Sequence, residues 1–169
     1  VGFPFETKNQ VIETLDFAGR LELDWNALYC FQPFPGTELY DYCIDNNLTA
    51  EYDAEECRDY EFHSAAEIKY IDYTKEELDK LNYLYNIKYN FLKNRNLMIG
   101  TKERLAQAER DFNYVLGIVP NHFFAYFCLA EIAAKRGESD KRIEYLKKAK
   151  EILETDRSFD WSYYISKLG

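Results

Sequence analysis

The sequence predicts a mainly α-helical protein with a small α/β portion at its N-terminal end. Between Lys102 and Glu154, apolar residues recur at steps of three and four in three successive segments, which is the spacing of one helix face. At the other end, an order of strand, helix, strand and helix is typical of an α/β crossover unit. With seven Gly and four Pro in 169 residues, a loop-rich β architecture is disfavoured.

The first predicted strand and helix lie at the start of the chain. Val1–Phe5 reads as the end of a strand that runs into a turn. Thr7 and Gln10 then form a capping box, which predicts the start of a helix that closes near Gly19. The apolar stripe of this helix consists of Val11, Ile12, Leu15 and Ala18.

The second strand and helix follow after a short connection. Trp25–Phe31 is a near-continuous apolar run of strand length, typical of a strand buried on both faces. Thr37 caps a helix that ends at Asn46-Asn47. Because two strands alone make an unstable sheet, residues 1–50 are expected to be the last α/β units of a truncated larger domain. The opening at Val1, without an initiator Met, leads to the same expectation.

Residues 51–73 are expected to form an acidic connector. Glu51–Phe62 is acidic without a clear period, which indicates a solvated loop or a short helix. Thr74 and Glu77 form a second capping box, and we expect their helix to run to about Arg95 as a bridge into a helical domain over residues 74–169. Its apolar arc is wide enough to predict neighbours on two sides, and includes Leu78, Leu81, Leu84, Tyr85, Ile87, Phe91 and Leu92.

The segment from Lys102 to Glu154 predicts tightly packed antiparallel hairpins. Turns are expected at Pro120–His122 and at Gly137–Ser139. The apolar faces comprise Leu105, Ala108, Phe112, Val115, Leu116 and Val119, then Tyr126, Leu129, Ala130 and Ala133, then Ile143, Leu146, Ala149 and Ile152. Phe159–Leu168 is predicted to be a short helix that covers the open end of the stack.

Charge and cysteine usage exclude several classes of function. The formal net charge of −9 disfavours binding to nucleic acid or to anionic lipid. No apolar run approaches the length of a membrane span. The cysteines have no disulfide-like or zinc-like spacing, so we expect small buried hydrophobic residues in a reducing, cytoplasmic compartment.

The region from Phe123 onward resembles the tetratricopeptide repeat, a helix–turn–helix unit of about 34 residues. The matching positions are Tyr126, Leu129, Ala130, Ala133, Gly137, Leu146 and Ala149. Arg142 departs from the usual alanine, and Glu154 replaces the closing proline. The preceding half-repeat fits at Ala108, Phe112, Val115 and Pro120. The resemblance implies a surface that binds a protein partner, while a generic three-helix bundle is the alternative.

Two N-terminal motifs resemble radical S-adenosylmethionine enzymes. Gly2–Thr7 is similar to their strand-to-helix turn G-x-P-G-E-T, with Phe5 in place of the second glycine. Phe31–Tyr40, FQPFPGTELY, resembles the segment after the sixth strand of that superfamily. It is especially similar to the branch with a cobalamin-binding domain, which includes anaerobic magnesium-protoporphyrin monomethyl ester cyclase and related methyltransferases. The motifs occur in the expected order, with one helix and one strand between them.

The resemblance implies a partial (β/α) barrel in which ligands lie at the C-terminal mouth of the parallel strands. The expected cofactor-binding residues are Gly2, Pro4, Glu6, Tyr29, Phe31 and Gln32. Gly2 would permit close backbone approach, and Phe31 would contact the adenine of S-adenosylmethionine. Glu6 either binds the ligand or stabilises the N-terminus of the first helix through its charge.

The resemblance also implies that this chain is inactive alone. The family needs a CxxxCxxC loop to hold its [4Fe–4S] cluster, and Cys30, Cys43, Cys57 and Cys128 lack that spacing. We therefore expect no catalytic residue, metal ligand or cofactor within this chain. Its parent would use S-adenosylmethionine, [4Fe–4S] and, by its branch, cobalamin. The expected partners are the remainder of the barrel and a protein bound by the helical repeats. The alternative function is a non-catalytic tetratricopeptide-like interaction scaffold.

Overall fold

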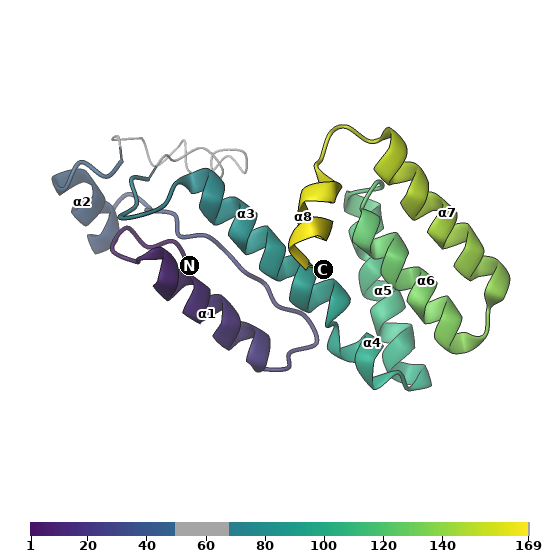
Figure 1. The fold of residues 1–169 in the computed structure, drawn as a ribbon. Coiled ribbons are helices and arrows are strands. Elements are labelled where there is room, and N and C mark those ends of the chain that lie inside the picture. Colours follow the sequence, from purple (N-terminus) through teal and green to yellow (C-terminus); the bar gives the residue numbers. More distant parts are fainter. Residues whose placement is uncertain (50–67, 169) are drawn as a thin grey trace. The chain divides into compact units, whose positions relative to one another are not determined.

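The computed structural model describes residues 1–49 and 68–168, which divide into two compact units (Figure 1). The first unit contains Val1–Arg20 and Ala27–Tyr83. The second contains Leu21–Asn26 and the chain from Leu84 onward. Within the described ranges both units are built from helices and irregular segments, without a strand. The prediction of a mainly α protein is therefore confirmed.

The first unit contains α1 (Lys8–Arg20), α2 (Glu38–Asp45) and most of α3 (Lys75–Asn86). The predicted caps are present. Thr7 N donates to Gln10 Oε1 over 2.9 Å, and Tyr40 N donates to Thr37 Oγ1 over 3.2 Å. At α3, Thr74 and Glu77 exchange two hydrogen bonds of 2.9 and 3.2 Å. These reciprocal bonds satisfy amide groups that the first helical turn leaves without partners.

The two predicted strands are extended segments in the structure. The first extended segment is shorter than Val1–Phe5. Glu6 N donates to the carbonyl of Phe3 over 2.9 Å, so the chain turns at Phe3. In Trp25–Phe31, the first two residues belong to the second unit. Only the stretch around Cys30 remains to pair with Val1, so the prediction of full strands is wrong.

The bridging helix is shorter and less regular than predicted. α3 ends at Asn86 and continues as a π-helical turn, η3 (Ile87–Leu92), which Lys93 N closes by donating to the carbonyl of Lys88 over 2.8 Å. Asn94 then caps a separate short helix, α4 (Arg95–Ile99). The predicted single helix to Arg95 is therefore wrong, because the widened turn and the asparagine cap interrupt it.

The second unit contains α4, α5 (Lys102–Ile118), α6 (Phe123–Arg136), α7 (Ser139–Thr155) and α8 (Trp161–Leu168). Helices α5, α6 and α7 pack in chain order, with α6 against both others. The predicted turns are present, and Gly137 adopts the left-handed conformation (φ 73°) that ends α6. Ala108, Ala130 and Ala149 are all buried, as expected for tightly packed helical hairpins.

The predicted apolar faces are wrong at two ends. Val119 is 42% exposed, and on α7 Ile143 and Leu146 are 65% and 36% exposed. Helix α8 does not cover this part of α7, because its buried Trp161 packs against His122, Phe123 and Phe124. The terminal helix thus covers the start of α6.

The remaining sequence-based predictions concern the connector and the membrane. Of the expected connector 51–73, residues 51–67, with the whole acidic stretch Glu51–Phe62, lie outside the described residues. Its last part is packed, since Ile68 and Tyr73 are buried and Lys69 N donates to the carbonyl of Leu48 over 2.8 Å. Among the described helices, none combines the length and the apolar character needed to cross a bilayer.

Candidate functional site

The structure brings together the two segments that the N-terminal motifs occupy. The Val1 amine donates to the carbonyl of Tyr29 over 3.1 Å, and Phe31 N donates to the carbonyl of Val1 over 2.7 Å. One residue thus bonds to the two residues that flank Cys30, which is the pattern between neighbouring parallel strands. Since both segments run in the same direction, the chain after Val1 and the chain after Phe31 lie at the same end of the pair.

Aromatic rings cover one side of this pair. Phe3 stacks on Phe31 with ring centroids 4.8 Å apart, and on Phe5 at 5.7 Å. Phe5 meets Tyr42 of α2 edge to face at 6.1 Å. Tyr29 extends away from the unit with 81% of its surface exposed. Planar rings of this kind offer stacking surfaces for another ring, such as a nucleobase.

Gly2 allows a close approach, but the neighbour that approaches is a protein side chain. It adopts a φ of +83°, and a Cβ at this position would lie 2.5 Å from Cδ2 of Leu78. Gly2 and the following Pro4 are both buried. In this structure the glycine therefore makes room for α3.

Glu6 closes the turn between Val1 and α1. Its Oε2 accepts a hydrogen bond from the backbone N of Phe3 over 2.8 Å, while its own N donates to the carbonyl of Phe3. The N-terminus of α1 is capped by Thr7 and Gln10 instead. One carboxylate oxygen of Glu6 is thus engaged in shaping the glycine-containing turn.

Gln32 carries a hydrogen-bond donor without a partner. Its Nε2 is buried and makes no hydrogen bond to any residue that the structure describes. A buried amide donor left without a partner costs free energy, so this position favours an acceptor on a ligand or on another part of a larger protein. Gln32 lies next to Phe31, whose ring is in the aromatic surface described above.

The opposite edge of the second segment is held by Asn82, a residue that the sequence analysis did not single out. Asn82 Nδ2 donates to the carbonyl of Leu28 over 3.1 Å and lies 3.5 Å from Cys30 Sγ. A side-chain amide therefore occupies the place of a neighbouring strand. The sequence signal was a polar residue inside the wide apolar arc of α3.

The outer edge of Val1–Phe3 is open. Gly2 has a φ of +83°, so its backbone departs from the extended conformation of a strand. Gly2 is buried, yet its N–H and C=O make no hydrogen bond within residues 1–49 and 68–168. Buried backbone groups are almost always paired, so those of Gly2 favour a partner from another part of a larger protein.

The cysteines in the described ranges do not form a metal site. Cys43 and Cys128 are buried and Cys30 is half-buried. Burial, with a smaller contribution from the charge of Asp79, raises the pKa of the Cys30 thiol and favours its protonated form. No group of three His, Cys, Asp or Glu side chains that could hold a metal ion occurs among the described residues. These residues therefore do not fit an iron–sulfur cluster.

Comparison with known proteins gives a partial match. A stretch of 48 residues, 28% of this chain, is 44% identical to a protein of Pyrococcus horikoshii named as an uncharacterized methyltransferase. The match covers 10% of the length of that protein, so the chain corresponds to a small part of this relative. No protein-family model matches the chain. No solved structure matches it.

Proposed function

We propose that this chain is the C-terminal portion of a radical S-adenosylmethionine enzyme of the methyltransferase type. The observation that carries the proposal is the 48-residue match at 44% identity to a protein named as a methyltransferase. The motifs at Gly2–Thr7 and Phe31–Tyr40 supply the narrower assignment to radical chemistry. In this proposal the first unit contributes part of the barrel wall that faces S-adenosylmethionine, and the chain is inactive alone.

The parallel pairing of Val1 with the Tyr29–Phe31 segment supports this assignment. In a (β/α) barrel, ligands bind at the C-terminal ends of parallel strands. The turn from Gly2 to Glu6 follows the paired Val1, and Gln32 follows the paired Phe31, so the turn and Gln32 belong to the same end. In this proposal the remainder of the barrel would continue from the Val1 side, because Asn82 already occupies the other edge of the Tyr29–Phe31 segment.

Two residues are best suited to hold the cofactor. The ring of Phe31 would stack on the adenine, and the unpaired Nε2 of Gln32 would donate to an acceptor atom of the ligand. S-adenosylmethionine, reduced by a [4Fe–4S] cluster, supplies a 5′-deoxyadenosyl radical in the family that the motifs resemble. Any ligands of that cluster would come from outside the described residues, and cobalamin would bind to another domain of the parent.

The helical unit is proposed to bind a protein partner. Its α5–α7 core is complete, yet Ile143 and Leu146 remain exposed on α7. In tetratricopeptide arrays each repeat packs against the next, so an exposed face at the last repeat-like helix is suited to a further packing element. A non-catalytic tetratricopeptide-like scaffold remains the alternative to the enzyme proposal.

The proposal is tested in the longer protein encoded by the same gene. The reading frame should extend upstream of Val1 and encode a CxxxCxxC loop. After anaerobic reconstitution, that protein should bind S-adenosylmethionine by calorimetry, while the 169-residue chain alone should not. Phe31→Ala and Gln32→Ala should each weaken binding by about fivefold, because each removes a contact on the order of 1 kcal/mol. Tyr114→Ala, exposed on α5 in the other unit, is the matched control.

Two results would contradict the enzyme proposal. One is a reading frame without the cysteine loop, which would leave the scaffold as the better function. The other is a reconstituted longer protein that binds S-adenosylmethionine equally well with and without the two substitutions, which would remove this chain from the cofactor wall.

A further inference from the structure

The segment Leu21–Asn26, which we call the strap, belongs to the second unit although the residues on both sides of it belong to the first. The chain leaves the first unit after Arg20 and re-enters it at Ala27. Leu21 and Leu23 are 48% and 46% exposed, so burial of these leucines does not explain the attachment. Three consecutive residues of the strap make the contacts that do.

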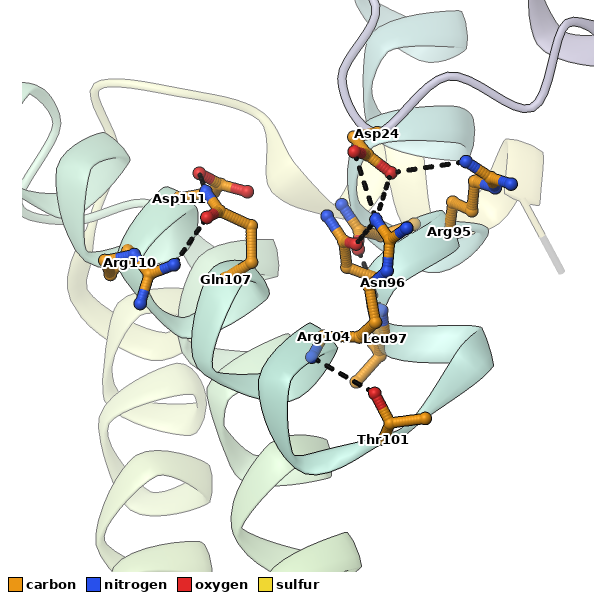
Figure 2. Close-up of polar contacts among 10 residues, drawn as sticks. Asp24, Arg95, Asn96, Leu97, Thr101, Arg104, Gln107, Arg110 and Asp111 are labelled. Carbon is orange, nitrogen blue, oxygen red and sulfur yellow. Dashed lines mark hydrogen bonds and ion pairs between the residues drawn. The ribbon is translucent and has the colours of Figure 1, made fainter.

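The first contact is an ion pair on the surface of the second unit. Arg104 Nη1 donates to both carboxylate oxygens of Asp24, over 3.0 and 3.2 Å, and Arg95 Nη1 lies 3.6 Å from the same carboxylate. Figure 2 shows Asp24 facing the two guanidinium groups, with Asn96 beside Arg104. Asn96 Oδ1 accepts from Arg104 Nη1 over 2.9 Å, so the guanidinium is held between an amide and a carboxylate.

The second contact joins a half-buried ring to a buried one, and the third contact is buried. Trp25 packs edge to face on Phe91, with ring centroids 5.6 Å apart. Asn26 N donates to Asn90 Oδ1 over 2.7 Å, and Asn90 Nδ2 donates to the carbonyl of Asn26 over 2.8 Å. A single carboxamide thus pairs with both backbone groups of one residue, as a neighbouring strand would.

The local structure around Asn90 holds this carboxamide in place. Asn90 is fully buried in the π-helical turn, a type of turn that often occurs at functional positions. Its carbonyl accepts from Nδ2 of the buried Asn94 over 3.0 Å. Asn26 is itself only 6% exposed, so water cannot easily replace the amide of Asn90.

We propose that Asn90 is a positioning residue that fixes the strap and thereby the start of the extended segment Ala27–Gln32. Tyr29, Phe31 and Gln32 follow Asn26 within six residues, so a backbone fixed at Asn26 restricts the positions open to them. These three residues belong to the proposed cofactor wall. The inference rests on the proposed function only for the role of that wall.

The experiment compares two local readouts in the 169-residue chain. Hydrogen exchange of the Asn26 amide reports on its bond to Asn90. Alkylation of Cys30, followed by peptide mass spectrometry, reports on the extended segment, where Asn82 lies beside the thiol. In Asn90→Ala, exchange at Asn26 should accelerate by about tenfold or more, and Cys30 should be alkylated several-fold faster.

Two further variants separate positioning from general loss of stability. Ile152→Val removes one buried methylene from α7 and should leave both readouts near those of the parent chain. Asp24→Asn removes the exposed ion pairs, keeps the core intact, and should give smaller increases in both readouts. It also preserves the test if Asn90→Ala fails to fold.

The inference is overturned if exchange at Asn26 accelerates while alkylation of Cys30 does not change, because Asn90 would then act on its neighbour alone. It is equally overturned if Ile152→Val accelerates Cys30 alkylation as much as Asn90→Ala does. Neither readout involves S-adenosylmethionine. Failure of cofactor binding in the longer protein would therefore contradict the proposed function and leave the strap untouched.

Discussion

The two units differ in how far their main clusters of stacked aromatic rings are buried. In the helical unit, Phe91 stacks on Phe112 at 5.5 Å and on His122 at 4.6 Å, and Trp161 meets His122 at 4.9 Å. All of these rings are buried. In the first unit, Tyr29 is 81% exposed and Phe5 is 51% exposed, and the stacked rings of Phe3 and Phe31 are only half-buried.

This difference indicates which unit has a more complete hydrophobic core of its own. Removing apolar surface from water is the main favourable term in folding, and the helical unit has buried the rings of Phe91, Phe112 and Trp161. The first unit buries one face through Val11, Leu15 and Leu78 and leaves the ring-bearing face on its surface. That asymmetry supports the proposal that other parts of a longer protein complete the first unit.

The largest expected effect is loss of a ring from the core of the helical unit. Phe112→Ala should lower the free energy of unfolding of this unit by about 3–5 kcal/mol, because it leaves a cavity beside Phe91. Urea unfolding followed by circular dichroism measures the change. Tyr114→Ala, two residues away and 73% exposed, should change stability by less than about 0.5 kcal/mol. Equal losses in both variants would break the contrast between buried and exposed rings.

The next effect is a loss of stability in acid that depends on His122. Burial lowers the pKa of His122 from its usual 6.5 to about 4, and its Nδ1 accepts a hydrogen bond from the N of Ala125 over 3.1 Å. Because the unfolded chain binds the proton more tightly, the stabilisation is complete above pH 6.5 and falls as the pH decreases towards 4. The loss should approach about 3 kcal/mol.

The measurement is the unfolding free energy of the helical unit at several pH values. His122→Asn keeps a cap acceptor for α6 without a titrating ring, so it should flatten the profile between pH 6.5 and 4. An unchanged profile in this variant would assign the acid sensitivity to other groups.

A smaller effect is expected at the glycine turn of the first unit. Gly2→Ala forces a left-handed φ on alanine, which costs about 1–2 kcal/mol, and brings Cβ towards Leu78. Gly36→Ala is the matched control, since its φ is +85° and no atom lies within 4 Å of its Cβ position. Hydrogen exchange in α1 should show a greater loss for Gly2→Ala. Equal losses would mean that the Leu78 side chain moves aside without cost.

The smallest effect is expected at the exposed end of the aromatic surface. Tyr29→Ala should change the stability of the first unit by less than about 0.5 kcal/mol, because most of its ring is already in water. Hydrogen exchange in α1 and α3 measures this change. A loss above about 1 kcal/mol would show that the ring is buried in solution, and the comparison between the two units would fail.

Much of the helical architecture could be predicted from the sequence, because helices depend on local signals. The capping boxes at Thr7 and Thr74, the cap at Thr37 and the glycine after α6 all mark boundaries that the structure contains. The end of α3 at Asn86 could not be predicted from local signals. The pattern of apolar residues along the sequence is the same whether the helix continues regularly or contains a π-helical turn.

The candidate site was less predictable. The motifs identified Phe31 and Gln32 as cofactor-facing residues, which remains a prediction, and the structure adds that a donor of Gln32 is unpaired. The roles of Leu78 beside Gly2, and of Asn82 and Asn90 beside extended backbone, depend on contacts between residues more than 50 positions apart. No local pattern in the sequence encodes such pairs.

The mainly helical class, the helix caps and the acidic charge could be read from the order of side chains along the chain. The burial of the rings, the carboxamides that replace a strand and the attachment of Leu21–Asn26 to the helical unit became apparent only in the folded chain. The physical reason is that burial and hydrogen-bond satisfaction are properties of neighbours in space, and distant segments become neighbours only when the chain folds.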